Sequence, residues 1–503
     1  MATVHQVDEE FTSLPLQALA EAALATATAG GASYAAFRME RILGTSVRLR
    51  DAEVEGVNDA EDVGYSVRVI LDGTWGFAAD VERTPEAAAR TARRALELAR
   101  VSAPVNTEPV DLSPEPRHEG TWVSSYEIDP WSVTNDEKIA LLQAWSADLL
   151  GSPGVDHVDS SLLAVKENKF YADSAGTVTA QQRVRVHPEF NAVAIDASTG
   201  AFETMATVAP PVGRGWEYLT GDVHDWRAEL AAIPQWLAEK LAAPSIEPGR
   251  YDLVIDPSNL WLTIHESIGH ATELDRALGY EANYAGMSFA TPDKLGTLQY
   301  GSDIMHITGD RTVEHGLSTV AWDDEGVKTQ SFDIVRDGVL VGYQLDRRIA
   351  SQVGYERSNG CAFADSPGHV PIQRMANVSL QPAADGPSTE DQIAGVEDGL
   401  YVVGDKSWSI DMQRYNFQFT GQRFFRIKSG RLVGQVKDVA YQATTTDFWG
   451  SMSAVGGPQT YVLGGAFNCG KAQPGQVAPV SHGAPSATFR NVNILNTAAE
   501  GAR

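Results

Sequence analysis

The chain has 503 residues, of which 43% are hydrophobic and 21% are charged, and its formal net charge is −27. This length and composition are typical of a folded protein with two or three domains. The excess of acidic residues excludes a sequence-independent grip on nucleic acid or on an anionic membrane, because both need clustered lysine and arginine. No run of about 18 apolar residues occurs, so we expect no membrane span.

The first ten residues are acidic and do not resemble a secretory signal. Two cysteines, Cys361 and Cys469, are too few for a disulfide framework. We therefore expect a reducing, cytoplasmic setting in which each cysteine is available for chemistry.

The first half of the chain mixes helical and strand patterns. Capping residues and apolar periodicity predict helices over residues 14–30, 84–103, 134–150 and 225–242. Alternating apolar residues predict strands over residues 33–50, 64–80 and 158–195, the last broken at 167–169 and 174–176. Asp72-Gly73 is typical of a hairpin turn.

A linker over residues 244–249 marks the main change in character. We predict an α/β N-terminal domain over residues 1–245, and a β-rich, largely antiparallel C-terminal domain over residues 246–503. The fold class is therefore α+β. Residues 332–342 and 425–434 share one pattern and are predicted to form equivalent hairpins.

One helix in the second domain carries the chemistry. It starts at Asp256-Pro257 and contains His265-Glu266-Ser-Ile-Gly269-His270. Two histidines flanking a glutamate suit Zn²⁺ and a general base, but these histidines are five residues apart, about 140° around a regular helix. A π-bulge or an unwound turn would bring the rings together, and Gly269 tolerates such a distortion. The alternative is a capped amphipathic helix with two surface histidines.

A catalytic zinc site needs a third protein ligand and an open position for water. Cys469 is the best candidate on chemistry, because thiolates bind Zn²⁺ and its Gly-rich loop can approach closely; the alternative is a small buried hydrophobe. Cys361 is expected to pack or to line a wall. Three further histidines are either ligands or simply exposed: His315, His369 and His482.

Glu266 is the natural general base, since it adjoins a ligand and can take a proton from the attacking water. Its alternative is an ordinary solvated carboxylate. Glu273 and Asp275 are expected either to orient a ligand imidazole or to be plain surface charges. Lys471 and His482, near Cys469 in sequence, are candidates for stabilising the oxyanion.

Over most of its length the chain resembles the TldD/PmbA family of metalloproteases. The pattern HExxxHxxExD runs from His265 to Asp275, and the Gly-rich segment around Cys469 and the hairpin at Gly64–Phe77 agree as well. The resemblance implies Zn²⁺ held by His265, His270 and Cys469, with Glu266 as the base. It also implies an α/β N-terminal and a β-rich C-terminal domain.

The same resemblance implies a function and a partner. The intact metal motif indicates the TldD kind of subunit, which pairs with a TldE (PmbA)-like subunit to enclose a chamber for unfolded peptides; a homodimer is the alternative. We therefore expect a cytoplasmic zinc metallopeptidase for short or unfolded peptides, without nucleic-acid or membrane partners. Two other interpretations stay open: an assembly subunit with structural zinc, and a zinc hydrolase of small amides or esters.

Overall fold

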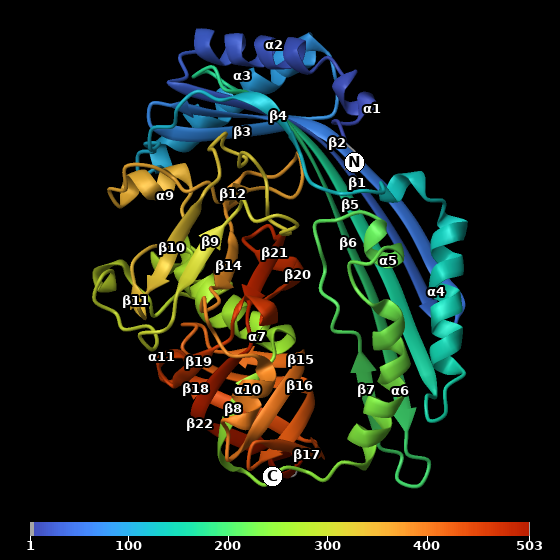
Figure 1. Cartoon of the computed structure of the whole chain (residues 1–503). Helices are drawn as coiled ribbons and strands as arrows, with labels where there is room; N and C mark the ends of the chain where they lie inside the picture. Colours follow the sequence, from blue (N-terminus) through green and yellow to red (C-terminus); the bar gives the residue numbers. More distant parts are fainter. Residues whose placement is uncertain (1–4, 502–503) are drawn as a thin grey trace.

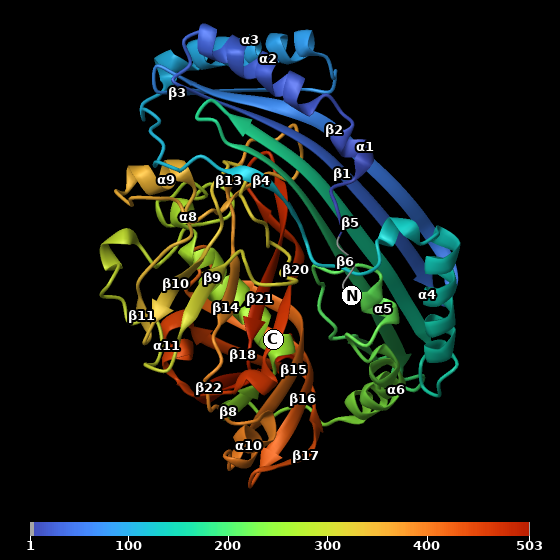
Figure 2. The same ribbon diagram turned by 45° about the horizontal axis from the view of Figure 1, so that its top comes forward.

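The computed structural model describes residues 5–501 and consists of two parts (Figure 1). Long, curved N-terminal strands arch over a C-terminal assembly built mainly of antiparallel strands, and the turned view in Figure 2 shows the same arrangement. The α+β class expected from the sequence is confirmed. The division at residue 245 stays a prediction, although the chain passes from one part to the other close to it.

The N-terminal sheet has seven strands in the order β3-β2-β1-β5-β6-β4, with β7 on β6. All of its pairings are antiparallel except β4 with β6. The strands are β1 Tyr34–Arg50, β2 Glu53–Leu71, β3 Thr74–Asp80, β4 Glu119–Val123, β5 His157–Asp173, β6 Val178–Ile195 and β7 Phe202–Ala206. The Asp72-Gly73 turn lies between β2 and β3, with positive φ at both residues, as the hairpin pattern predicts.

Helices cover the two ends of this sheet (Figure 1). The helices are α1 Glu9–Thr12, α2 Leu16–Ala29, α3 Pro85–Ser102, α4 Asn135–Leu150, α5 Glu217–Thr220 and α6 Trp226–Ala242. One apolar core joins α2 and α3 to the sheet, and a second joins α4 and α6 to its far end. The four predicted helices are confirmed, including the capping box of Thr134 and Glu137.

The predicted break at residues 167–169 is wrong, because β5 continues through it. These polar side chains have partners across the sheet and in the C-terminal part. Glu167 pairs with Arg183 and Arg185, and Lys169 pairs with Asp324. A polar run that looks like a turn in sequence is thus a satisfied strand interior. The break at residues 174–176 is confirmed.

The central C-terminal sheet has the strand order β15-β8-β22-β18-β16-β17, with β19 on β22. Because β15 also pairs with β16, five of these strands close into a ring. The strands are β8 Gly249–Ile255, β15 Asp398–Ile410, β16 Asn416–Lys428, β17 Arg431–Val436, β18 Val439–Thr444, β19 Met452–Val455 and β22 Ala487–Asn496.

Three smaller sheets complete this part. Their strands are β9 Ile307–Asp310, β10 Ser331–Arg336, β11 Val339–Leu340, β12 Ala362–Phe363, β13 Ile372–Gln373, β14 Asn377–Leu380, β20 Val462–Lys471 and β21 Gln476–Ala484. The two predicted hairpins form as β10–β11 and β16–β17, each with positive φ at both turn residues, but in different sheets. They share a turn and not a place in one assembly.

The helix that carries the motif lies inside the C-terminal core. It comprises α7 Pro257–Ile264, the π-helical turn η3 His265–Gly269, the 3₁₀ turn η4 His270–Thr272 and α8 Leu274–Ala277. Leu260, Ile264 and Ile268 form its apolar stripe and pack against the surrounding strands. The other helices here are α9 Arg347–Gln352, α10 Thr389–Ala394, α11 Thr445–Gly450 and α12 Thr497–Gly501. Within residues 5–501, none of the helices combines the length and apolar character needed to cross a bilayer.

Candidate metal centre

The five-residue spacing of the histidines is accommodated by a π-helical turn, as predicted. The backbone N–H of His270 donates to the carbonyl of His265, which is the i to i+5 bond of a π-helix. The role of Gly269 differs from the expectation, since its φ of −52° is ordinary for a helix. A Cβ there would lie 2.7 Å from Sδ of Met375 and 3.3 Å from Cε1 of His482, so glycine is needed for room.

Two side chains from outside the helix donate hydrogen bonds to backbone carbonyls of the π-helical turn. The Tyr300 hydroxyl donates to the carbonyl of Ser267, and the Gln344 amide donates to that of Gly269 at 2.7 Å. Both donors are buried. An unpaired buried carbonyl is unfavourable, so these two contacts stabilise the distorted turn.

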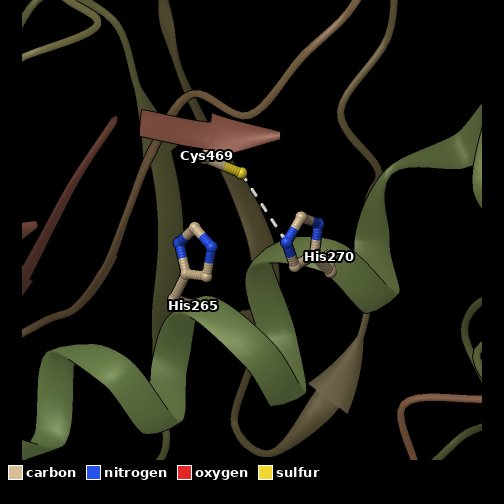
Figure 3. A group of neighbouring side chains, drawn as sticks. All are labelled: His265, His270 and Cys469. Atoms are coloured by element: carbon tan, nitrogen blue, oxygen red, sulfur yellow. Dashed lines mark hydrogen bonds between the residues drawn. The ribbon is translucent and has the colours of Figure 1, made fainter. Parts of the chain in front are cut away.

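Three side chains converge above this turn (Figure 3). His265 and His270 point from the helix towards Cys469, which comes from strand β20. One potential ligand atom from each lies within 4.8 Å of the others, and all three residues are buried. The sequence predicts Cys469 in a loop, but the structure places it next to a β-bulge in a strand. The bulge shifts the strand register just before Cys469, and the thiol of Cys469 points at the helix.

The spacing of these atoms fits a zinc ion. Sγ of Cys469 lies 3.6 Å from Nε2 of His270. Zn–N and Zn–S bonds of about 2.05 and 2.3 Å at a tetrahedral angle would place the two donors about 3.6 Å apart. Among the described residues no fourth histidine, cysteine or carboxylate joins the group, so the protein donors leave one tetrahedral position open.

His265 is held in one tautomer by a neutral relay. Nδ1 of His482 lies 2.8 Å from the carbonyl of Val378, which can only accept, so this nitrogen carries the proton. The other nitrogen of His482 then accepts from Nδ1 of His265 at 2.7 Å. Nε2 of His265 is left with a lone pair for a metal.

His270 is held by a charged network. Its Nδ1 donates to Glu273 at 2.9 Å, and Glu273 is paired with Arg276 and Lys471. Lys471 also contacts Asp275 at 2.8 Å. Because Lys471 follows Cys469 on the same strand by two residues, this network joins the supports of two of the three candidate ligands.

Burial and neighbouring charge favour the protonation states that a metal requires. Burial lowers the pKa of His265, lowers that of His270 to about 4, and takes that of His482 well below its usual value. Burial raises the pKa of the Cys469 thiol, but His270 and Arg374 outweigh it and the net shift is downward. Neutral imidazoles and a thiolate are the forms that bind Zn²⁺, and these shifts favour both.

Glu266 is buried and is paired with Arg414, whose Nη1 lies 2.6 Å from its carboxylate. No motif in the sequence singles out Arg414, which is 148 residues away at the tip of the β15–β16 hairpin. The alternative of a solvated helix carboxylate is therefore wrong for Glu266.

The remaining candidates lie elsewhere or have other roles. His315 contacts the carbonyl of Gly213, His369 pairs with Asp365, and Cys361 is buried apart from the cluster. Neither candidate for stabilising the oxyanion is available, because Lys471 is enclosed by carboxylates and both nitrogens of His482 are engaged.

A cleft of about 710 Å³ borders this centre between the N-terminal sheet and the C-terminal part. Residues 464–468 of β20, immediately before Cys469, form part of its wall together with Trp261. The Trp261 ring lies 6.3 Å from that of His265 and is stacked on His482. The indole N–H donates to Asp405, and burial raises the pKa of that carboxyl to about 6.

Family models match both parts of the chain. The model described as PmbA/TldA metallopeptidase C-terminal domain matches residues 248–496, and the one described as PmbA/TldA metallopeptidase domain 1 matches residues 35–99.

Relatives match over nearly the whole length. A metalloprotease of Methanothermobacter thermautotrophicus is 28% identical over 92% of this chain and 96% of its own. A zinc metalloprotease TldD homolog of Saccharolobus solfataricus is 22% identical over 92% of this chain and 97% of its own.

Solved structures share the fold. TldE from Thermococcus kodakarensis superposes with a TM-score of 0.69 at 16% identity, covering 95% of this chain and 99% of that one. A Thermotoga maritima protein that carries the name of a DNA gyrase modulator gives a TM-score of 0.76 at 16% identity, covering 95% and 99%. At these identities the likeness concerns the fold alone.

Proposed function

Because the chain belongs to the PmbA/TldD metallopeptidase family, we propose that it is a zinc metallopeptidase acting on short or unfolded peptides. His265, His270 and Cys469 are the zinc ligands, and Glu266 is the general base. The observation that carries the proposal is a buried group of three donors with an open fourth position beside a buried carboxylate. A structural zinc site would be closed by four protein ligands.

Each residue has a defined task. Bound Zn²⁺ would supply Lewis-acid chemistry, polarising the scissile carbonyl and acidifying water. Glu266 accepts a proton from the attacking water and later donates it to the leaving amine. His482 and Glu273 fix the two imidazoles, and the Trp261 ring packs edge-on against that of His265.

The surroundings suit an extended peptide. Among the described residues β20 pairs with β21 alone, and its segment 464–468 faces the cleft. A peptide can add as a strand to this edge, and main-chain hydrogen bonds would bind it with weak side-chain preference. Tyr284, Met287 and Met412 expose apolar surface close to Arg414, where they can hold side chains that folded proteins bury.

The assembly is part of the same proposal. Residues 246–503 form the metallopeptidase domain, and residues 1–245 enclose substrate and contact a TldE-like subunit, with a homodimer as the alternative. The fold shared with TldE supports a pair of related chains. Both cysteines are free, and a reducing cytoplasm would keep the Cys469 thiol available for zinc.

The test compares wild type with Glu266→Gln, each purified alone and with a co-expressed TldE-type subunit. We expect about one zinc per chain in both proteins, and loss of casein-peptide cleavage by about 10²–10⁴-fold in the variant. Glu314→Gln, at an exposed carboxylate, is the control. A wild type that binds no zinc, or that cleaves no peptide with or without the partner, would refute the proposal.

A further inference from the structure

Arg414 is held beside the proposed base by its own scaffold. Asp411 accepts hydrogen bonds from the backbone N–H groups of Gln413, Tyr415 and Asn416, which fixes the hairpin tip. Arg414 itself has a φ of 62°, a conformation that a non-glycine residue adopts only when its surroundings require it. The tip also pairs with residues 287–289, through the carbonyls of Met412 and Gln413.

Among the described residues four cations contact the candidate ligands, Glu266 or Glu273, and three of these cations are fully buried. Arg276 and Lys471 are wholly buried against Glu273, and Arg374 is buried with its guanidinium on the carbonyls of Cys469 and Gln476. Arg414 differs, because its side chain is 14% exposed. It is the one of the four that a bound substrate can reach.

The hydrogen bonds of Arg414 leave donor capacity. Nη1 lies on Glu266 and Nη2 donates to the carbonyl of Ala285 at 3.1 Å, whereas the buried Nε has no partner within residues 5–501. A guanidinium carries five N–H donors, so two contacts use only part of it. An unpaired buried donor next to a reaction centre is a candidate for a ligand contact.

We propose that Arg414 is the catalytic residue that stabilises the oxyanion during peptide hydrolysis, an inference that rests on the proposed function. The role needs a positive donor that faces the reacting carbonyl and is rigidly placed beforehand. Arg414 is a partly exposed cation held beside Glu266, whereas Lys471 is enclosed by carboxylates and both nitrogens of His482 are engaged.

The chemistry balances at each step. When the water oxygen bonds to the carbonyl carbon, one water proton passes to Glu266 and the carbonyl π pair moves onto its oxygen. Glu266 becomes neutral and the carbonyl oxygen becomes anionic, so the negative charge beside Arg414 moves from carboxylate to oxyanion. When the C–N bond breaks, the proton on Glu266 passes to the leaving amine and the carboxylate regains its partner. Arg414 therefore faces one negative charge throughout.

The experiment measures kcat and KM on a quenched fluorescent peptide, with zinc content, for wild type, Arg414→Met and Arg414→Lys. We expect Arg414→Met to lower kcat by about 10²–10³-fold, the usual effect of losing one oxyanion donor. KM should stay within about 3-fold by the same logic, and zinc content should not change. Arg423→Met is the matched control, because Arg423 lies in the adjoining strand β16, is buried and stacks on Trp236 away from the site.

A second readout separates this role from a structural one. A phosphinic pseudopeptide of alanine resembles the tetrahedral intermediate, so Arg414→Met should weaken its inhibition by about the same factor as kcat. A purely structural role predicts loss of zinc or an equal change in KM, and either result would overturn the inference.

Arg414→Lys keeps a positive donor and should retain part of kcat. Arg414→Gln provides a second neutral variant if Arg414→Met fails to fold, and unchanged kcat in either folded neutral variant also overturns the inference. A wild type that cleaves nothing would instead refute the proposed function.

Discussion

The two histidines of the candidate centre have the same task but opposite kinds of support. On the neutral side, His265 donates a hydrogen bond to His482, which donates to a backbone carbonyl, and none of these groups carries a formal charge. On the charged side, His270 donates a hydrogen bond to Glu273, whose charge two buried cations neutralise. Both arrangements leave Nε2 for a metal, so ligand orientation does not require charge. The two sides differ in how much unfolding free energy the protein loses when a supporting residue is replaced.

The largest effect is expected on the charged side. Glu273→Gln would leave Lys471 and Arg276 buried without their shared counter-ion, which costs about 3–5 kcal/mol. We expect that loss of unfolding free energy in urea, together with loss of bound zinc.

Asp252→Asn is the control for this variant, because Asp252 forms a part-exposed pair with Arg490 and should cost about 1 kcal/mol or less. Equal urea midpoints for the two variants would contradict the comparison.

A smaller effect is expected on the neutral side. His482→Phe removes the acceptor for Nδ1 of His265, so the imidazole loses its fixed tautomer. We expect zinc affinity to fall by about 10–100-fold, as for other residues that support a metal ligand. Competition with a chromophoric chelator measures it.

His482→Gln, which can both donate and accept, should restore part of the affinity. His157→Gln, at a half-exposed histidine paired with Asp51, is the control. A zinc affinity in His482→Phe equal to that of wild type would show that the relay is not needed.

The smallest effect is a difference in pH dependence between the two sides in zinc-free protein. Burial takes the pKa of His482 well below its unfolded value of about 6.5, so only the unfolded state gains this proton in mild acid. Stability is therefore lost as pH falls from about 6.5, by at most about 1.4 kcal/mol per unit for one group. His482→Phe should show a shallower slope between pH 6.5 and 5.

The charged side responds at lower pH. Burial raises the pKa of Glu273, but Lys471 and Arg276 outweigh it and hold that pKa well below 4.5. Its contribution is present above pH 4.5 and lost only as pH falls further, so Glu273→Gln should keep the wild-type slope between pH 6.5 and 5. Urea unfolding between pH 6.5 and 5 measures this pH dependence in both variants. A shallower slope of unfolding free energy against pH in Glu273→Gln would contradict the predicted difference between the two sides.

Several features of the candidate site could be predicted because they are local in sequence. The five-residue spacing of His265 and His270 predicted a π-bulge or an unwound turn if both bind one ion, since a regular helix would separate the rings, and the structure has the π-turn. Capping residues likewise predicted α3 and α4, and Asp72-Gly73 predicted its turn. Residue types within one or two turns of the chain are enough for these conclusions.

Other features were out of reach because they depend on long-range packing. Charged residues in β5 looked like a break until partners from β6 and the C-terminal part satisfied them. Residue type suggested that Cys469 could be a ligand, but only the bulge in β20 brings its thiol near His270. Residue type predicted that Gly269 supplies backbone freedom, but glycine is needed there because Met375 and His482 leave no room for a Cβ.

By itself, then, the sequence determined the family, the α+β class, the distorted turn and the chemical types of the candidate ligands. Only the tertiary structure decided which groups orient and neutralise them. His482, Lys471 and Arg414 lie about 150–200 or more residues from the motif, and their roles follow from directed hydrogen bonds in a buried, low-dielectric interior. Such bonds depend on side-chain positions that no local pattern encodes.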